Sequence, residues 1–207
     1  MKSATTRSKS ILLTIGFFLT LGTIVSAQQT TSNDGEKQPL QSASTVSEEE
    51  KKKFYQLTES VPKVLVAGET EKAKDYAETL LKQAETLKDD WNYGNAIHVA
   101  NLVLGHIALD SGDMTEAKRY LLAAGNTPGS PQLNSFGPDM RLAKALLEKG
   151  EKETVLEYFD LCAKFWKLKR DRIDEWKAAI EKDKMPQFGA NIFYHFPQSE
   201  ITKQTNF

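Results

Sequence analysis

The chain has 207 residues, with 27 Lys or Arg against 28 Asp or Glu, and a formal net charge of -1 at pH 7. Such a balanced charge offers no strong field for a polyanion, so nucleic acid is not an expected partner. The single cysteine, Cys162, cannot form an intramolecular disulfide. It falls on the apolar side of a predicted helix, where a free cysteine behaves as a small buried hydrophobe.

The first 27 residues predict a signal peptide. Three basic residues precede an apolar run from 11 to 25, and Val25-Ser26-Ala27 has the small residues of a cleavage site. The alternative is an uncleaved anchor, but the run is shorter than the ~20 apolar residues that a spanning helix needs. We therefore expect an exported protein, periplasmic or extracellular, without a membrane span after cleavage.

A polar segment and a helical domain follow. Residues 28–47 contain almost nothing apolar, which predicts a disordered linker. Residues 48–186 predict one helical domain without a convincing strand. Its first helix should break at Ser60-Val61-Pro62, because proline suits the first turn of a helix better than its interior. A second helix is predicted over 70–87 from apolar residues spaced three and four apart.

A helix is also predicted over 92–110, broken by Ser111-Gly112, and another follows from its cap Asp113 to Gly125. The segment 126–138 carries three prolines and two glycines and predicts a loop. Helix 139–149 should follow it.

The remainder of the chain predicts one more helical stretch and a tail. Residues 151–184 contain no glycine or proline, so they predict one long helix or a helix that bends near Leu168. Residues 187–207 predict an irregular aromatic tail. We expect the tail to dock on the domain, because large exposed apolar patches are rare on soluble monomers; the alternative is an interaction segment.

Three short stretches repeat one another at intervals of roughly forty residues, which is typical of stacked helical repeats. They are Leu65-x-x-Gly68-Glu69, Leu109-x-x-Gly112-Asp113 and Leu147-x-x-Gly150-Glu151. Each continues with a small residue five positions after its glycine and a tyrosine three positions further. These positions are Ala73 and Tyr76, Ala117 and Tyr120, and Val155 and Tyr158.

Each of the three stretches is the turn between two predicted helices. The second and third of these helix pairs resemble tetratricopeptide repeats. In the second, the matching residues are Leu104-Gly105, Ala108, Gly112-Asp113, Ala117, Tyr120-Leu121, Ala124 and Pro128. In the third, they are Leu142-Ala143, Leu146, Gly150-Glu151, Val155, Tyr158-Phe159 and Cys162. The first pair keeps mainly its turn and second helix. Asn101 replaces the usual early aromatic, and the repeat spacing exceeds the family's 34 residues.

The resemblance implies an all-α fold of about three helix-turn-helix hairpins with a C-terminal capping helix. The alternative is an ordinary helical bundle, in which the same positions are simply core. In the family, the first helix of each hairpin lines a concave surface that receives a peptide or partner helix. The aligned partner-binding residues are Leu102, His106, Asp110, Met140, Lys144 and Glu148.

The sequence offers no catalytic signature, and we predict neither an enzyme nor a cofactor. His98 and His106 stand eight residues apart, too far for one metal on a single helix face, so no metal site is predicted. The alternative function is an envelope enzyme or enzyme subunit with a site in the 126–138 loop. A basic stretch around Phe165, Trp166 and Trp176 is interpreted as a solvated helix face, with an anionic partner as the alternative.

Overall fold

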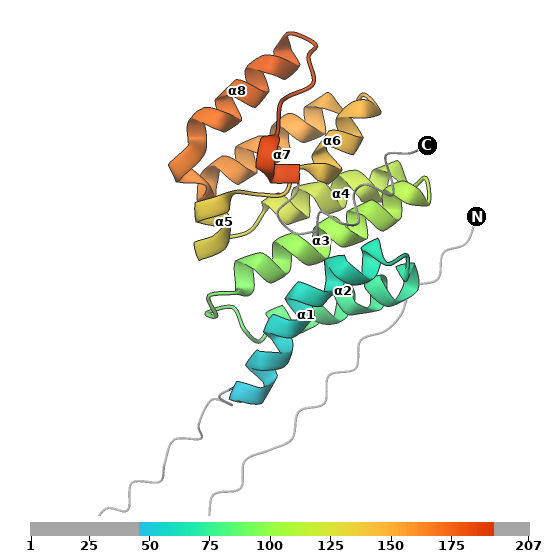
Figure 1. The fold of residues 1–207 in the computed structure, drawn as a ribbon, viewed down its shortest axis with the longest axis vertical. Coiled ribbons are helices and arrows are strands. Elements are labelled where there is room, and N and C mark those ends of the chain that lie inside the picture. Colours follow the sequence, from blue (N-terminus) through green and yellow to red (C-terminus); the bar gives the residue numbers. More distant parts are fainter. Residues whose placement is uncertain (1–45, 193–207) are drawn as a thin grey trace, which may run out of the picture. The chain divides into compact units, whose positions relative to one another are not determined.

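The computed structural model describes residues 46–192. The predicted signal peptide, nearly all of the predicted linker and residues 193–207 of the tail lie outside these residues. Residues 46–192 fold into eight α-helices and two 3-10 turns, with no strand among them (Figure 1). The all-α prediction is therefore confirmed for this part of the chain.

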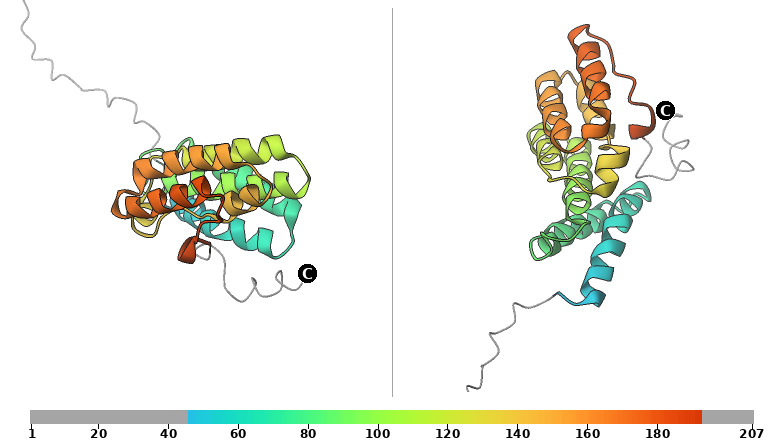
Figure 2. Two further views of the ribbon diagram at one scale, coloured as in Figure 1. Left: turned by 90° about the horizontal axis from the view of Figure 1, so that it is seen from above. Right: turned by 90° about the vertical axis from the view of Figure 1, so that its left-hand side faces the viewer.

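The helices form antiparallel pairs. Helix α1 pairs with α2, α3 with α4, and α6 with α7; α3 also packs on α1 and α2, α4 on α7, and α8 on α7 (Figures 1 and 2). The helices are α1 (Glu48–Val66), α2 (Thr70–Ala84), α3 (Tyr93–Asp110), α4 (Met114–Gly125), α5 (Pro131–Phe136), α6 (Arg141–Glu148), α7 (Lys152–Phe165) and α8 (Arg170–Glu181). The 3-10 turns are η1 (Lys167–Lys169) and η2 (Gly189–Ile192).

The three repeated glycine turns have one geometry. Gly68, Gly112 and Gly150 have φ of 79°, 84° and 88°. In each turn the glycine N–H donates to the carbonyl three residues back, at 2.9–3.1 Å, and the following acidic residue donates five residues back, at 2.8–3.2 Å. These are the two bonds of the Schellman motif, which ends a helix on a left-handed residue. The sequence repeat thus corresponds to a repeated backbone turn.

The small residues of the repeat lie where helices approach closely. Ala73, Ala117 and Val155 are fully buried. At Gly105, a Cβ atom would lie 2.4 Å from Leu142 Cδ2 and 3.2 Å from Tyr120 Cβ. The absence of a side chain at Gly105 therefore lets α3 approach both α4 and α6, as expected for a small residue at this position.

Helix α3 lies between two hydrophobic clusters. Thirteen of its 18 residues are buried. Val99, Val103 and Leu104 belong to a cluster with α1 and α2, whereas Leu102 and Leu109 belong to a cluster with α4, α6, α7 and α8. A helix that is apolar on nearly every side must be covered on nearly every side.

The prediction that Ser60-Val61-Pro62 breaks the first helix is wrong, because α1 continues to Val66 with Pro62 inside it. Val61 and Pro62 are both buried, and Pro62 lines a cleft together with Val99 and Val103 of α3. This tertiary packing offsets the intrahelical hydrogen bond that proline cannot donate.

The segment 126–138 is not wholly a loop. Ser130 accepts a hydrogen bond from the N–H of Leu133 at 3.0 Å, Pro131 occupies the first turn, and Gly137, at φ 88°, follows the last helical residue. These residues form the short helix α5. The predicted helix 139–149 begins two residues later, at Arg141.

The stretch 151–184 is not one long helix. It bends near Leu168, which was one of the two predicted alternatives. Helix α7 ends at Phe165, η1 follows, and α8 begins at Arg170. The start of the tail docks on the domain as expected: Phe188 is 3% exposed, and its ring centroid lies 5.1 Å from that of Trp176. Cys162 is buried, and burial raises the pKa of its thiol well above the ordinary value.

Replacement of Gly112 by alanine tests the turn. The added Cβ would have no atom within 4 Å, so the cost comes only from the left-handed backbone, about 1 kcal/mol. We expect Gly112→Ala to lower the free energy of unfolding by that amount in urea denaturation. Gly112→Asn should lower the free energy of unfolding by less, because asparagine tolerates the left-handed conformation. An alanine variant as stable as the parent would contradict the prediction.

Candidate functional site

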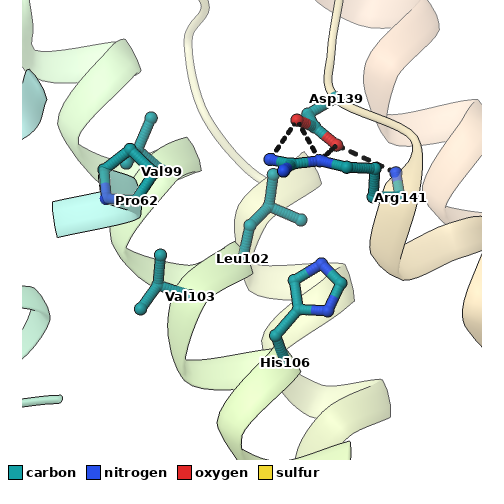
Figure 3. Close-up of a pocket in the computed structure, with 7 residues that line it drawn as sticks. All are labelled: Pro62, Val99, Leu102, Val103, His106, Asp139 and Arg141. Carbon is teal, nitrogen blue, oxygen red and sulfur yellow. Dashed lines mark hydrogen bonds and ion pairs between the residues drawn. The ribbon is translucent and has the colours of Figure 1, made fainter. Parts of the chain in front are cut away.

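A shallow cleft lies where the first helices of the three pairs meet. The residues that line it are Pro62, Val99, Leu102, Val103, His106, Asp139 and Arg141 (Figure 3). Pro62 comes from α1, four residues come from α3, and the last two come from the start of α6 and the segment before it. The enclosed volume is about 10 Å³, which is the space of a single water molecule. The cleft suits a side chain laid across it better than a bound small molecule.

The polar end of the cleft is an ion pair. Asp139 is fully buried, and its carboxylate accepts from Arg141 Nη2 at 2.6 Å and from Arg141 Nε at 2.9 and 3.0 Å. The Arg141 backbone N–H adds a bond of 2.8 Å to Asp139 Oδ1. Multiple charge-assisted bonds of this kind hold both groups in one geometry.

His106 stands beside this pair (Figure 3). Burial lowers the pKa of its imidazole to about 4, with a further lowering by the Arg141 charge and an opposing effect of Asp139. The ring is therefore neutral at neutral pH, with a hydrogen-bond donor on one nitrogen and an acceptor on the other.

The backbone of Asp139 is held from two sides. Its N–H donates to His98 Nε2 at 3.1 Å, and its carbonyl accepts from Tyr158 Oη at 2.9 Å. Because His98 Nε2 accepts, Nδ1 carries the proton and donates to the Ala124 carbonyl, 3.0 Å away. One buried histidine thus ties the α4 terminus to the segment that enters α6.

The start of the tail supports the same segment. Asn191 donates from Nδ2 to the Pro138 carbonyl at 2.9 Å and to the Phe136 carbonyl at 3.1 Å. The Met140 N–H donates to the Asn191 carbonyl at 2.8 Å. Residues 138–140 are therefore fixed by α3, α7 and η2 together, which gives the cleft a rigid polar end.

A second polar network joins α1, α3 and the segment between α4 and α5. Asn92 Nδ2 donates to Thr58 Oγ1 at 2.9 Å, and Asn95 Nδ2 donates to Asn92 Oδ1 at the same distance. Ser130 Oγ donates to Asn95 Oδ1 at 2.6 Å, and Thr127 Oγ1 donates to the Gly94 carbonyl at 3.1 Å. In this segment, the side chains of Thr127 and Ser130 thus make bonds that position α3.

The six predicted partner-binding residues separate into two groups. Leu102 and Met140 are 4% and 0% exposed and belong to the hydrophobic core. Asp110 and Glu148 are exposed, whereas His106 and Lys144 are partly exposed, and Lys144 forms an ion pair with Glu148. The structure brings Leu102 and His106 into one cleft.

The cleft residues that the sequence analysis did not predict arise in two ways. Val99 stands three residues before Leu102 and Val103 three residues before His106, so helical periodicity could have found them. Asp139 was expected only as the first residue of helix 139–149, and Pro62 only at a break in the first helix. No sequence pattern pointed to Arg141, whose place in the cleft depends on its ion pair with Asp139 near His106.

Two further properties concern the described part of the chain. In residues 46–192, no helix is both long enough and apolar enough to cross a membrane. Over the same residues, no three His, Cys, Asp or Glu side chains group so that they could hold a metal ion.

A search of protein-family models, of curated proteins and of solved structures found no match to this chain.

Replacement of His98 by phenylalanine tests the Asp139 anchor. The variant keeps a ring of similar size but leaves the Asp139 N–H and the Ala124 carbonyl unpaired in the core. We expect the free energy of unfolding to fall by about 2–4 kcal/mol. Tyr158→Phe removes one donor and should lose about 1 kcal/mol. The double variant should be non-additive in denaturation, because both groups hold the same peptide; strict additivity would contradict the shared anchor.

The depressed pKa of His106 predicts a pH dependence of stability. In the unfolded chain, His106 binds a proton below its ordinary pKa of 6.5. In the folded chain, it binds a proton only below its lowered pKa of about 4. The contribution of neutral His106 to the free energy of unfolding is therefore fully present above pH 6.5 and is lost as the pH falls toward 4. Between pH 7 and 5 we expect His106→Gln to lose less stability than the parent, by on the order of 1 kcal/mol. Parallel urea-stability profiles for the two proteins would contradict this.

Proposed function

We propose that the chain is an exported interaction or assembly scaffold that binds a segment of a partner protein on the face formed by α1, α3 and α6. The observation that carries the proposal is the cleft to which the first helices or their entry segments all contribute. A catalyst needs few groups in one pocket, whereas a scaffold needs a surface shared by successive pairs.

The proposed likeness to tetratricopeptide repeats is supported by packing. Three turns share the same two hydrogen bonds, the small residues after them are buried, and Gly105 allows the close approach of neighbouring helices. An ordinary bundle has no physical reason to repeat this combination in phase. Helix α8, which packs on α7, would serve as the cap of the last pair.

The chemistry of the face suits a protein segment. The cleft between α1 and α3 offers apolar contacts and a neutral histidine, and the paired Asp139 and Arg141 close one end. Asp110 follows His106 by one turn of α3, and the Lys144–Glu148 ion pair follows Arg141 along α6, so charges of both signs continue the face. Such a mixture favours recognition of a peptide or helix with an apolar anchor and flanking charges. Because the enclosed space is small, we propose a modest affinity.

The proposed exported location depends on the N-terminal sequence, as does the proposed absence of a membrane span after cleavage. The alternative of an envelope enzyme with a site in residues 126–138 has no specific observation in its favour. Thr127 and Ser130 make structural hydrogen bonds there.

Site-specific photo-cross-linking would test the binding face. A photoreactive amino acid at His106 or Lys144 should yield a cross-linked partner in the native envelope, because both positions border the proposed surface. The same amino acid at Lys74, exposed on α2, serves as the matched control and should yield much less of that product. Replacement of His106 and Lys144 by alanine should weaken capture of that partner roughly tenfold or more.

Two outcomes would contradict the proposal. One is equal cross-linking from Lys74 and from the two face positions, which would indicate nonspecific contact. The other is undiminished capture by the double alanine variant, when its circular dichroism spectrum matches that of the parent. A cross-link obtained only from residues 126–138 would favour the enzyme alternative.

A further inference from the structure

The corner between α7 and α8 carries an unbalanced positive charge. Lys164, Lys167, Lys169, Arg170 and Arg172 are all exposed, and Asp171 is the one acidic residue among positions 164–172. No ion pair within residues 46–192 engages any of the five. By contrast, Lys152 of α7 pairs with Asp183, just beyond α8, and Lys177 of α8 pairs with Asp160 of α7. Five exposed cations without an ion pair among the described residues are thus clustered at one corner.

The same corner exposes apolar side chains. Leu168, in the middle of η1, is 72% exposed, the most of the large hydrophobic residues in the described part of the chain. Phe136 is 52% exposed at the end of α5, which packs against η1. A single exposed leucine is ordinary. Here, however, it is set among five exposed cations.

The corner is held firmly in this form. Phe165 and Trp166 before η1 are 5% and 2% exposed, and Ile173 and Trp176 after it are 1% and 2% exposed. The rings of Trp166 and Trp176 lie 5.7 Å apart. These anchors fix both ends of η1, so Leu168 is held outward by the packing on either side of it. Figure 1 shows this end of α8 beside α5.

We propose that residues 164–172, the basic corner, dock this protein on an anionic lipid surface. The cations would meet headgroup phosphates, while Leu168 enters the boundary between headgroups and acyl chains. An acidic protein would complement the cations but gives no reason for an outward leucine at their centre. Asp174 and Glu175 lie one turn along α8 from Arg170 and Arg172 and offset part of the positive charge. Residues 164–175 still carry five cations against three acidic residues.

This inference is independent of the proposed partner-binding face, since none of the residues of the corner lines the cleft. If both hold, the domain would be oriented on a membrane while its α1, α3 and α6 face binds a protein. Either can fail without the other, because the cross-linking positions and the corner variants do not overlap.

Vesicle partitioning of the chain as isolated from the cell tests the proposal. The probes are phosphatidylcholine vesicles with roughly one third phosphatidylglycerol, and vesicles of phosphatidylcholine alone. We expect binding to the anionic vesicles that weakens steeply with salt, and little binding to the neutral ones. Replacement of Lys167, Lys169 and Arg170 together by glutamine should lower the partition coefficient on the order of 100-fold.

The matched control removes the same charge elsewhere. Lys74, Lys82 and Lys88 are exposed residues of α2 and the turn after it, and their triple replacement by glutamine should change partitioning only a few-fold. Leu168→Ser keeps the charge and should lower partitioning about tenfold. Near-ultraviolet circular dichroism would verify that each variant retains the packing of Trp166 and Trp176.

Three results would overturn the lipid proposal. Equal losses in the corner and control variants would indicate a general charge effect. Undiminished partitioning of Leu168→Ser would remove the apolar contact. Binding to soluble polyglutamate that depends on the corner cations, without binding to anionic vesicles, would assign the corner to an acidic polymer or protein instead.

Discussion

The burial of α3 on nearly every side is the constraint on which the rest of the structure depends. A helix in this position belongs to both hydrophobic clusters, so it joins the first pair to the second and third. Its apolar residues can serve two cores only if neighbouring helices approach from opposite sides. Gly105 permits the approach of α4 and α6, and Gly94 permits that of the segment between α4 and α5: a Cβ at Gly94 would lie 1.8 Å from the Gly129 carbonyl oxygen. Close packing around one central helix is therefore what arranges the pairs.

A central helix that also carries polar side chains requires partners for them, because an unpaired buried polar group is costly. Asn95 and His98 find those partners in chain segments far along the sequence, at Ser130 and at Asp139. Hydrogen bonds have a preferred direction, whereas apolar contacts do not. These bonds therefore fix how the segments before α5 and α6 lie on α3. The cleft is a consequence of this arrangement, since Asp139 reaches it only while His98 and Tyr158 hold its backbone.

The cleft and the basic corner have different physical characters. The cleft combines apolar walls, a neutral imidazole and an ion pair whose acid is fully buried, which favours shape-specific contact with a protein. The corner carries an excess of cations around an exposed leucine, which favours a diffuse anionic surface. The two proposed contacts would be compatible, because the two surfaces share no residue.

Most of the helices and all three repeated turns could be predicted from the sequence, because these depend on local physics. Apolar periodicity predicted the second helix and α3, a left-handed backbone requires the glycines at 68, 112 and 150, and Asp113 caps α4 as expected, with a bond of 3.0 Å from the Glu116 N–H. Local rules failed where distant packing decided the outcome. Pro62 remains helical because α3 covers it. The meeting of His106 with Asp139 and Arg141 could not be predicted, because more than thirty residues separate His106 from the pair. Only the tertiary hydrogen bonds of His98, Tyr158 and Asn191 bring the pair to the cleft, and no local sequence window contains both ends of such bonds.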